Sequence, residues 1–149
     1  MTVILVVNGP NLNLLGERKP DIYGKRTLYD VNERLRKKAE DNGLKVLCFQ
    51  SNHEGDIIDF IHDHRRVASG LLINPGAFTH YSYALRDAIE AVDFPAVEIH
   101  ISDISAREDF RSKSVIEPVC KAQISGEGIS GYEKGLLQLI QTVEAEEKK

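Results

Sequence analysis

Short apolar segments of strand length alternate with amphipathic helical patterns along almost the whole chain. Residues 3–7 are a continuous run of Val, Ile and Leu, which is typical of a strand buried on both faces of a parallel sheet. Four further strands are predicted over residues 44–49, 70–74, 96–101 and 119–124. Helical spacing predicts helices from residue 27 to about 41, through residues 57–61, over about 79–91 and over 132–143. The alternation indicates an α/β protein with helices on both faces of the sheet.

The number and order of these segments restrict the topology further. Right-handed crossovers between five parallel strands favour a doubly wound sheet with the order 2-1-3-4-5, because eight strands would be needed for a barrel. The 149 residues, 42% of them hydrophobic, predict a single domain over residues 1–149 with a frayed tail over 144–149. Cys48 and Cys120 fall on the two edge strands of this order, so we expect two free thiols that lie far apart.

The charge pattern excludes several classes of partner. The net charge is -4 and no run of Lys or Arg is present, which disfavours nucleic-acid binding, although local arginines could still bind a small anion. The first residues lead straight into a strand, and no apolar run approaches the roughly 20 residues of a spanning helix. We therefore expect a soluble, cytoplasmic protein without a membrane partner.

An unusually long connection, residues 8–24, separates the first strand from the first helix. Such connections usually have about 2 to 6 residues, and longer ones tend to be lids or binding loops. Tyr23 could act as a base if a nearby cation such as Arg18 stabilised its phenolate, but spacing alone slightly favours packing roles for both residues. Gly9 and Gly16 do not have the spacing of a phosphate-binding loop, which disfavours a nucleotide site.

Three strands that are neighbours in the predicted sheet end in segments that contain polar residues. These segments occupy residues 8–11, 74–76 and 98–102. In open α/β sheets, ligands bind at the carboxyl ends of the strands where the strand order reverses. The convergence of these three segments therefore predicts the position of a site.

The fourth strand carries the best candidate for acid–base chemistry. Alternation places Glu98, His100 and Ser102 on one face, so the carboxylate can accept the ring N–H of the histidine and fix its tautomer. We favour this interpretation over a buried ion pair at a strand end. The Ser105 to Glu108 segment has the pattern of a capping box, and a short helix there would leave backbone N–H groups near residues 101–102 free for an anion.

Charged residues beyond this strand leave two interpretations open. Arg107 and Arg111 would share one face of a helix, as an anion clamp or as a solvated face. His80 begins the third predicted helix, where a histidine is more often a capping or packing residue than a catalyst. Asp87 lies about two turns further on, too far for its own subunit's site.

Six segments in one register together resemble the type II 3-dehydroquinate dehydratases. They are N-G-P-N-L-N-L-L-G-E-R (8–18) with Y-G (23–24), S-N-H-E-G (51–55), N-P-G-A-F-T-H (74–80), E-I-H-I-S (98–102), A-R-E-D-F-R (106–111) and I-S-G-E-G-I-S-G-Y (124–132). The resemblance covers essentially the whole chain, and several long motifs in fixed order make it specific. It implies a flavodoxin-like catalytic domain with residues 17–25 as a lid.

The resemblance implies reversible dehydration of 3-dehydroquinate to 3-dehydroshikimate, in the shikimate pathway or in quinate breakdown. It implies no metal, no Schiff base and no organic cofactor. Tyr23 would be the base that removes the proton next to the ketone, with Arg18 stabilising its phenolate and Arg107 assisting. Asn11 would stabilise the enolate oxygen through a water molecule, and His100 would protonate the departing hydroxyl.

The same resemblance implies a substrate-binding set. In it Glu98 orients the acid, and the backbone N–H groups of Ile101 and Ser102 hold the substrate carboxylate. The substrate hydroxyls would be held by Asn74, His80 and Arg111.

The resemblance also implies an assembly, a homododecamer built as a tetramer of trimers. Asp87 would reach the site of a neighbouring subunit, which answers the objection of distance. Lys19, Asp103 and Ser112 depart from residues common in the family, and none of them is a chemical group of the site.

A flavodoxin-like binding module without catalysis would share the fold. We disfavour it because the end of the first strand has neither a phosphate loop nor an acidic cluster.

Overall fold

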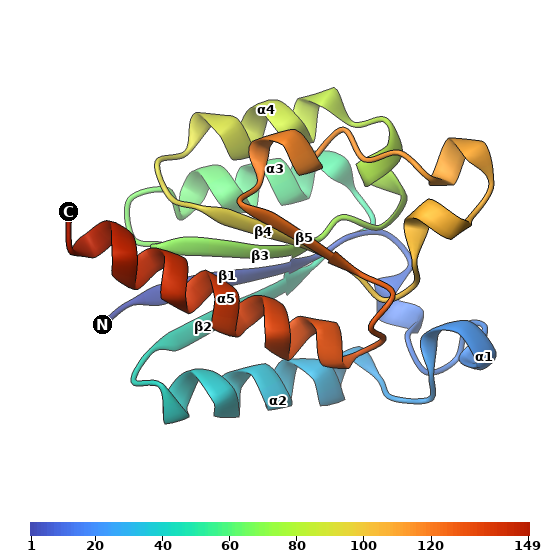
Figure 1. Cartoon of the computed structure of the whole chain (residues 1–149), viewed down its shortest axis with the longest axis horizontal. Helices are drawn as coiled ribbons and strands as arrows, with labels where there is room; N and C mark the ends of the chain where they lie inside the picture. Colours follow the sequence, from blue (N-terminus) through green and yellow to red (C-terminus); the bar gives the residue numbers. More distant parts are fainter.

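A five-stranded parallel sheet forms the centre of the computed structural model, which describes residues 1–149 (Figure 1). The strands are β1 (Val3–Asn8), β2 (Lys45–Gln50), β3 (Gly70–Asn74), β4 (Ala96–His100) and β5 (Ala122–Ser125). Their order is β2-β1-β3-β4-β5 and every neighbouring pair is parallel, which confirms the predicted doubly wound, flavodoxin-like sheet.

Helices cover both faces of this sheet. They are α1 (Pro20–Tyr23), α2 (Leu28–Asp41), α3 (Glu54–Asp63), α4 (Tyr83–Ala91) and α5 (Ser130–Glu147). Helices α2 and α5 lie on one face and α3 and α4 on the other, while α1 lies beyond the carboxyl ends of the strands (Figure 1). The connections contain the short 3-10 turns η1 (Leu12–Leu14), η2 (Gly76–His80), η3 (Ile104–Ala106), η4 (Asp109–Arg111) and η5 (Glu117–Val119).

Strand β1 shows why two layers of helices are needed. Ile4 and Val6 belong to the core that includes α2 and α5, whereas Leu5 and Val7 belong to the core that includes α3 and α4. All four side chains have no exposed area. Because successive side chains of a strand point to opposite faces, a strand of this composition is stable only when both faces are covered.

The first turns of two helices show how local polar groups set the element boundaries. The hydroxyl of Thr27 accepts from the N–H of Asp30, and the Asp30 carboxylate accepts from the N–H of Thr27, a capping box that begins α2 at Leu28. The prediction that α4 begins near Thr79 was wrong. Thr79 lies in η2, and Ser82 caps the helix by accepting from the N–H of Leu85.

The prediction for the start of β5 was also wrong, because residues 117–119 form the turn η5 around Pro118 and the strand begins at Ala122. Cys48 on β2 and Cys120 just before β5 therefore lie toward opposite edges, and both are free. Burial raises the pKa of the Cys48 thiol to about 11 and that of Cys120 to about 12, so both stay protonated at neutral pH.

The last helix is longer than predicted. Its helical conformation continues to Glu147, although the sequence suggested an end at Val143 and a frayed tail. The additional turn, residues 144–147, consists of Ala and Glu, which favour the helical conformation. An ion pair between Lys121 Nζ and Glu146 Oε1 at 3.9 Å also connects this turn to the residue before β5. No helix in the structure combines the length and the apolar character that crossing a membrane requires.

The ends of β1 and β3 meet so closely that Gly9 has no room for a side chain. Its N–H donates to the carbonyl of Asn74 at 2.8 Å, and a Cβ atom at this position would lie 2.4 Å from the carbonyl oxygen of Pro75. This neighbour is backbone, so it can move only if the strand ends separate.

We predict that Gly9→Ala lowers the free energy of unfolding by about 1–3 kcal/mol, the usual cost of overpacking. Urea denaturation measures this change. Gly55→Ala is the matched control, because its Cβ would meet nothing within 4 Å and it lies in the first turn of α3. The control should match the wild type or gain up to about 1 kcal/mol; an equally stable Gly9→Ala protein would contradict the steric argument.

Candidate active site

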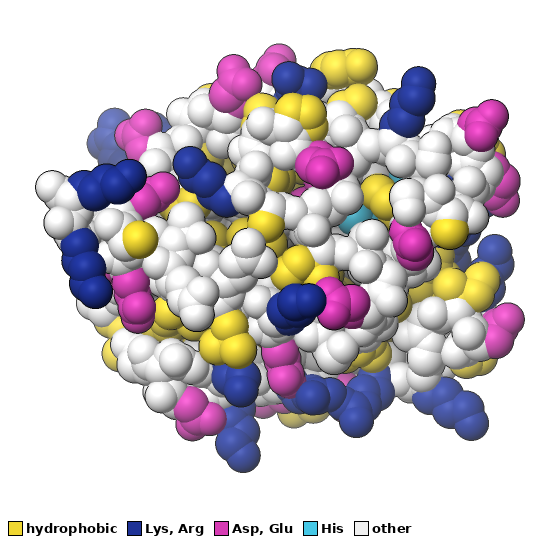
Figure 2. Space-filling model, in the orientation of Figure 1, with side chains coloured by type: hydrophobic (Ala, Val, Ile, Leu, Met, Phe, Trp, Pro, Cys, Tyr) yellow, Lys and Arg dark blue, Asp and Glu magenta, His cyan; other side chains and the backbone are white.

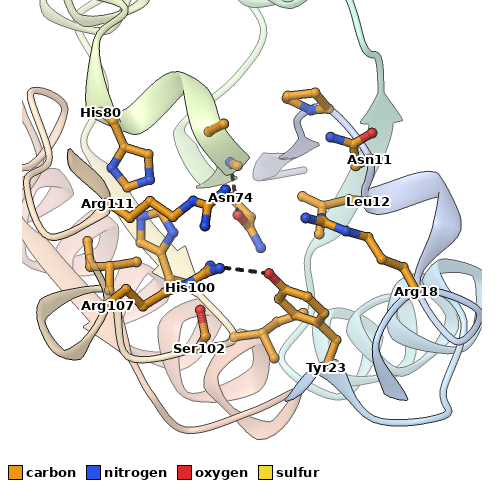
Figure 3. A pocket seen from close by; sticks show the side chains of 15 residues that line it. Asn11, Leu12, Arg18, Tyr23, Asn74, His80, His100, Ser102, Arg107 and Arg111 are labelled. Atoms are coloured by element: carbon orange, nitrogen blue, oxygen red, sulfur yellow. Dashed lines mark hydrogen bonds between the residues drawn. The ribbon is translucent and has the colours of Figure 1, made fainter. Parts of the chain in front are cut away.

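A cavity of about 190 Å³ opens at the carboxyl ends of β1, β3 and β4, where the strand order reverses (Figure 3). Its lining consists of Pro10, Asn11, Leu12, Arg18, Tyr23, Asn74, Gly76, Ala77, His80, His100, Ile101, Ser102, Ile104, Arg107 and Arg111. Every predicted site residue lines it except Glu98 and Asp87. Glu98 contacts His100 on the same strand, β4, whereas Asp87 is an exposed residue of α4.

The strand-to-helix connection contributes Tyr23 at the end of α1. Pro20 begins this short helix, and the left-handed backbone of Lys19 (φ 43°) and of Gly24 (φ 82°) turns the chain on either side of it. The side chain of Tyr23 is half-buried and points into the cavity (Figure 3). Loop, turn and helix together therefore present a single phenol to the site.

Two arginines surround this phenol in different ways. Arg107 donates from Nη1 to the Tyr23 hydroxyl at 3.3 Å, and the Arg18 guanidinium carbon lies 5.2 Å from the centre of the ring (Figure 3). The sequence had suggested Arg18 as the partner of the phenolate and Arg107 as its assistant. In the structure Arg107 makes the contact to oxygen, and both cations favour a negative charge on it.

His100 is held from behind by Glu98, as its spacing predicted. The Nε2 atom of His100 lies 2.5 Å from the Glu98 carboxylate, and Nδ1 has no protein partner. Glu98 has no exposed area and His100 is 5% exposed. Burial alone would raise the pKa of the Glu98 carboxyl, but the hydrogen bond and charge of His100, with the hydroxyls of Thr79 and Ser114, hold that pKa below its usual 4.5.

The segment after β4 differs from the prediction. Ser105 and Glu108 do not form a capping box; instead Asp103 accepts from the N–H of Ser105 and caps η3. Arg107 and Arg111 are therefore not on one helix, since an extended break separates η3 from η4. Both still line the cavity, and Arg111 pairs with Glu108 at 3.0 Å.

Two backbone N–H groups at the end of β4 are free. The carbonyls of Ile101 and Ser102 accept from Gly128 and Gly126, each at 3.1 Å, but the N–H groups of Ile101 and Ser102 make no hydrogen bond within the chain. Both residues line the cavity. Paired N–H groups of this kind are a binding site for a carboxylate.

His80 and Asn74 complete the polar lining on the β3 side. The Nδ1 atom of His80 lies 2.7 Å from the carbonyl of Lys113, which leaves Nε2 without a protein partner. Asn74 donates from Nδ2 to the Tyr132 hydroxyl at 2.9 Å and accepts from the N–H of Gly76 at 3.1 Å. Contacts with Lys113 and Tyr132, which do not line the cavity, therefore help to orient the two side chains.

Tyr132 is a residue that sequence reasoning did not single out. Its hydroxyl donates to Oδ1 of Asn8 at 2.6 Å while it accepts from Asn74, so one buried phenol connects β1, β3 and α5. Burial raises the pKa of this hydroxyl well above its usual value, with Asn74 opposing the shift, and it stays a donor. Its partners are 124 and 58 residues away in the chain, and no local pattern could have indicated them.

The structure contains no group of three or more His, Cys, Asp or Glu side chains placed to hold a metal ion. Acidic and basic side chains are mixed over the face seen in Figure 2, without a field of one sign. The positive groups of the cavity, Arg18, Arg107 and Arg111, are thus a local feature.

Comparison with known proteins gives consistent results. The family model described as dehydroquinase class II matches residues 2–140. The 3-dehydroquinate dehydratase of Halalkalibacterium halodurans is 57% identical over 141 residues, which cover 95% of this chain and 97% of that protein. The crystal structure of the type II dehydroquinase of Butyrivibrio crossotus superposes with a TM-score of 0.91 at 45% identity, covering 93% of this chain and 97% of the other. The crystal structure of the type II dehydroquinase of Propionibacterium acnes superposes with a TM-score of 0.90 at 40% identity, covering 95% of this chain and 97% of the other.

We predict that Tyr132→Phe lowers the free energy of unfolding by about 1–3 kcal/mol, because it removes the hydrogen-bond partner of Oδ1 of Asn8 and of Nδ2 of Asn74, both buried. Guanidinium denaturation measures the change. Tyr29→Phe removes the same atom from a side chain that is 70% exposed and should stay within about 0.5 kcal/mol of wild type. Equal stability of the two variants would show that the Tyr132 hydroxyl is not needed to hold the two amides.

Proposed function

The chain belongs to the class II dehydroquinase family and has 3-dehydroquinate dehydratase activity, and we propose that Tyr23 and His100 carry out this dehydration as base and acid. The activity makes the chain a lyase of the shikimate pathway. In the proposed reaction a proton next to the ketone leaves first, giving an enolate. The enolate then expels the β-hydroxyl as water and forms the enone 3-dehydroshikimate.

The observation that carries this proposal is that Tyr23 and His100 line one cavity in opposite electrostatic settings. Tyr23 has Arg107 at its oxygen and Arg18 over its ring, and both cations stabilise the phenolate that must take the proton. A carbon acid next to a ketone is weak, so the tyrosine has to be present as its anion to accept the proton. The two arginines also stabilise the negative charge that moves onto the substrate.

His100 supplies the proton for the leaving hydroxyl. With Nε2–H directed to Glu98, the nitrogen free to donate is Nδ1. Each turnover moves one proton onto Tyr23 and one off His100, so the resting state returns when a proton passes back from the tyrosine to the histidine. Asn11, at the opposite side of the cavity, is assigned to the enolate oxygen through a bridging water molecule.

The remaining groups hold the substrate. Its carboxylate is assigned to the N–H groups of Ile101 and Ser102, an assignment supported by the absence of any partner for them within the chain. Asn74, His80 and Arg111 are assigned to the substrate hydroxyls, which fits their position on the cavity wall. The connection over residues 17–25 is the lid that brings Tyr23 to the reacting carbon and excludes water.

We further propose the homododecamer, arranged as a tetramer of trimers, in which Asp87 reaches a neighbouring subunit's site. Asp87 is exposed on α4 and outside the cavity of its own chain. Tyr83, one turn before Asp87 on α4, and Tyr81, just ahead of the helix, are 63% and 59% exposed, and a second copy would cover this aromatic surface. The cytoplasmic location stays a prediction from the sequence.

We predict that Tyr23→Phe lowers kcat by roughly 10²- to 10⁴-fold, the usual contribution of a general base. The rise of enone absorbance from 3-dehydroquinate in the ultraviolet measures it. Tyr29→Phe, on the exposed face of α2, should turn over like the wild type. Absence of turnover by the wild type would refute the activity, and full activity of Tyr23→Phe would refute the base.

We predict by light scattering a mass twelve times the 16.7 kDa of one chain. Asp87→Ala should keep this mass and lose about 10-fold or more in kcat/KM, because it removes a polar contact from the adjoining subunit's site. A monomeric mass with full activity would contradict both the assembly and the shared site.

A further inference from the structure

We propose that Thr79 and Ser114 are positioning residues of the reaction, because their hydroxyls complete the pocket that fixes the Glu98 carboxylate against His100. Neither residue lines the cavity, so both act through Glu98 rather than on the substrate. This inference rests on the proposed function, because it takes His100 to be the acid.

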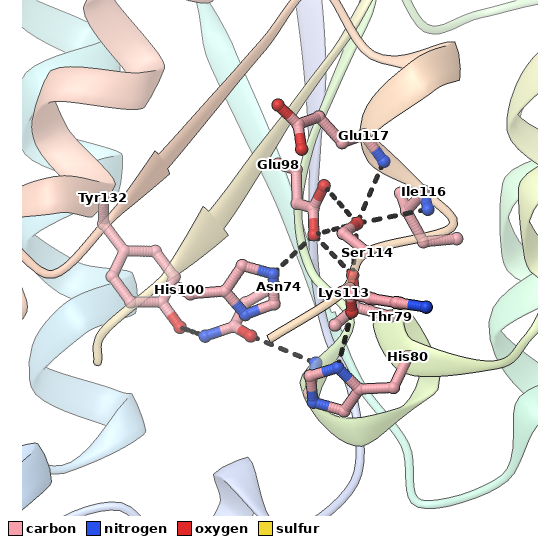
Figure 4. Close-up of polar contacts among 11 residues, drawn as sticks. Asn74, Thr79, His80, Glu98, His100, Lys113, Ser114, Ile116, Glu117 and Tyr132 are labelled. Atoms are coloured by element: carbon pink, nitrogen blue, oxygen red, sulfur yellow. Dashed lines mark hydrogen bonds and ion pairs between the residues drawn. The ribbon is translucent and has the colours of Figure 1, made fainter. Parts of the chain in front are cut away.

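The Glu98 carboxylate is surrounded by hydrogen-bond donors (Figure 4). Oε2 lies 2.5 Å from His100 Nε2 and 2.5 Å from Thr79 Oγ1. The hydroxyl oxygen of Ser114 lies 2.9 Å from both carboxylate oxygens and 2.8 Å from Thr79 Oγ1. A carboxylate without exposed area is stable only when it is paired and hydrogen-bonded in this way.

The direction of each hydrogen bond follows from the other contacts of Ser114. Its oxygen accepts from the N–H of Ile116 at 3.2 Å and from that of Glu117 at 3.0 Å, so its single hydrogen is left for the carboxylate. His100 and Thr79 donate as well, which gives three donors directed at one carboxylate. A neutral carboxyl group would place its own hydrogen against one of these donors. The pocket therefore fits only ionised Glu98, and it keeps the hydrogen of His100 on Nε2.

The two hydroxyls come from segments that are tied together independently. Thr79 belongs to η2, and Ser114 to the connection between η4 and η5. The N–H of Val115 donates to the carbonyl of Thr79 at 2.7 Å, and the carbonyl of Lys113 contacts Nδ1 of His80. The same connection thus supports a residue on the cavity wall and the carboxylate behind the acid.

Few other groups that titrate face this pocket. Cys120, just before β5, feels the charge of Glu98, but burial raises its pKa to about 12 and it stays neutral. Glu117 of η5 is exposed to solvent. Gln123, the register partner of Glu98 on β5, carries no charge. His100 is thus the ionisable group that contacts Glu98 directly.

The removal of a donor has a definite consequence for pH dependence. The hydroxyls of Thr79 and Ser114 lower the pKa of Glu98, after the larger opposing effect of burial and the larger lowering by His100. Without one of them that pKa rises, so Glu98 takes up a proton at a higher pH as the solution is acidified. Protonated Glu98 no longer supports the imidazolium of His100. The acid limb of the kcat profile reports protonation of the base, so the loss of ionised Glu98 should appear as a further fall in kcat that begins at a higher pH in the variant than in the wild type.

The test measures kcat, KM and the pH profile of Ser114→Ala and Thr79→Val with 3-dehydroquinate as substrate. We expect kcat to fall roughly 10- to 100-fold, the loss for a hydrogen bond to a charged group, with KM within about 2-fold. The further fall in kcat at low pH should begin at a higher pH in both variants than in the wild type. Thr79→Ser returns the hydroxyl and should recover most of the kcat lost in Thr79→Val. Thr142→Val, at a half-buried position of α5 where the hydroxyl donates to the carbonyl of Gln138, makes the same chemical change away from the site and should leave kcat unchanged.

The same substitutions in a Glu98→Gln protein test whether the loss of kcat depends on Glu98. In a Glu98→Gln protein, Ser114→Ala should lower kcat by no more than about 2-fold further, because residues of one unit are not additive. A full 10-fold additional loss, or wild-type kcat and pH profile in Ser114→Ala, would overturn the proposal.

His100→Ala distinguishes failure of the acid assignment from failure of the positioning roles. If it keeps full kcat, the acid assignment itself fails. If it is inactive while Ser114→Ala and Thr79→Val behave as wild type, only the positioning roles fail. Should Thr79→Val not fold, Ser114→Ala and Thr79→Ser carry the same comparison.

Discussion

The burial of the central strands on both faces is the constraint on which the rest of the molecule depends. Residues 4–7 of β1 have no exposed area, and helices pack against both sides of them. Unpaired polar groups are costly on such faces, so open polar chemistry is confined to the carboxyl edge of the sheet. Glu98 and His100 are the exceptions on β4, and they are tolerated because they pair with each other and because Glu98 also accepts from the hydroxyls of Thr79 and Ser114.

The polar groups at this edge are organised as two closed networks behind the cavity wall. One joins Asn8, Tyr132 and Asn74, and the other joins Glu98, Thr79, Ser114 and His100. Each network sends one side chain, Asn74 or His100, into the cavity with its orientation fixed from outside. Fixed groups of this kind do not have to reorganise during a reaction, which is the main source of electrostatic catalysis. The rigid wall and the proposed lid therefore have separate tasks.

Local patterns were sufficient for the sheet order, the site's position and the Glu98–His100 pair, because each depends on strand periodicity or on the ends of strands. They were insufficient where distant groups compete. The hydroxyl of Thr79 is bound to Glu98, 19 residues away, while Ser82 caps α4, and Asp103 takes the capping role expected of Ser105. The role of Tyr23 came from the family resemblance, since spacing alone favoured packing.

The surroundings of Tyr23 and His100 differ in the way that a base and an acid require. Tyr23 is half-buried beneath two guanidinium groups that favour a negative oxygen, whereas His100 is buried against a carboxylate that favours a positive ring. Two titratable groups in one cavity take opposite roles when their environments favour opposite charges. Here the two environments come from different parts of the chain. The arginines belong to the lid and to the loop after β4, while the carboxylate is enclosed by the sheet and the connection at Ser114. The proposed lid carries both Tyr23 and Arg18, so its withdrawal would take the base away from Arg107 and leave the acid intact. In this proposal lid closure is the step that brings base and acid together.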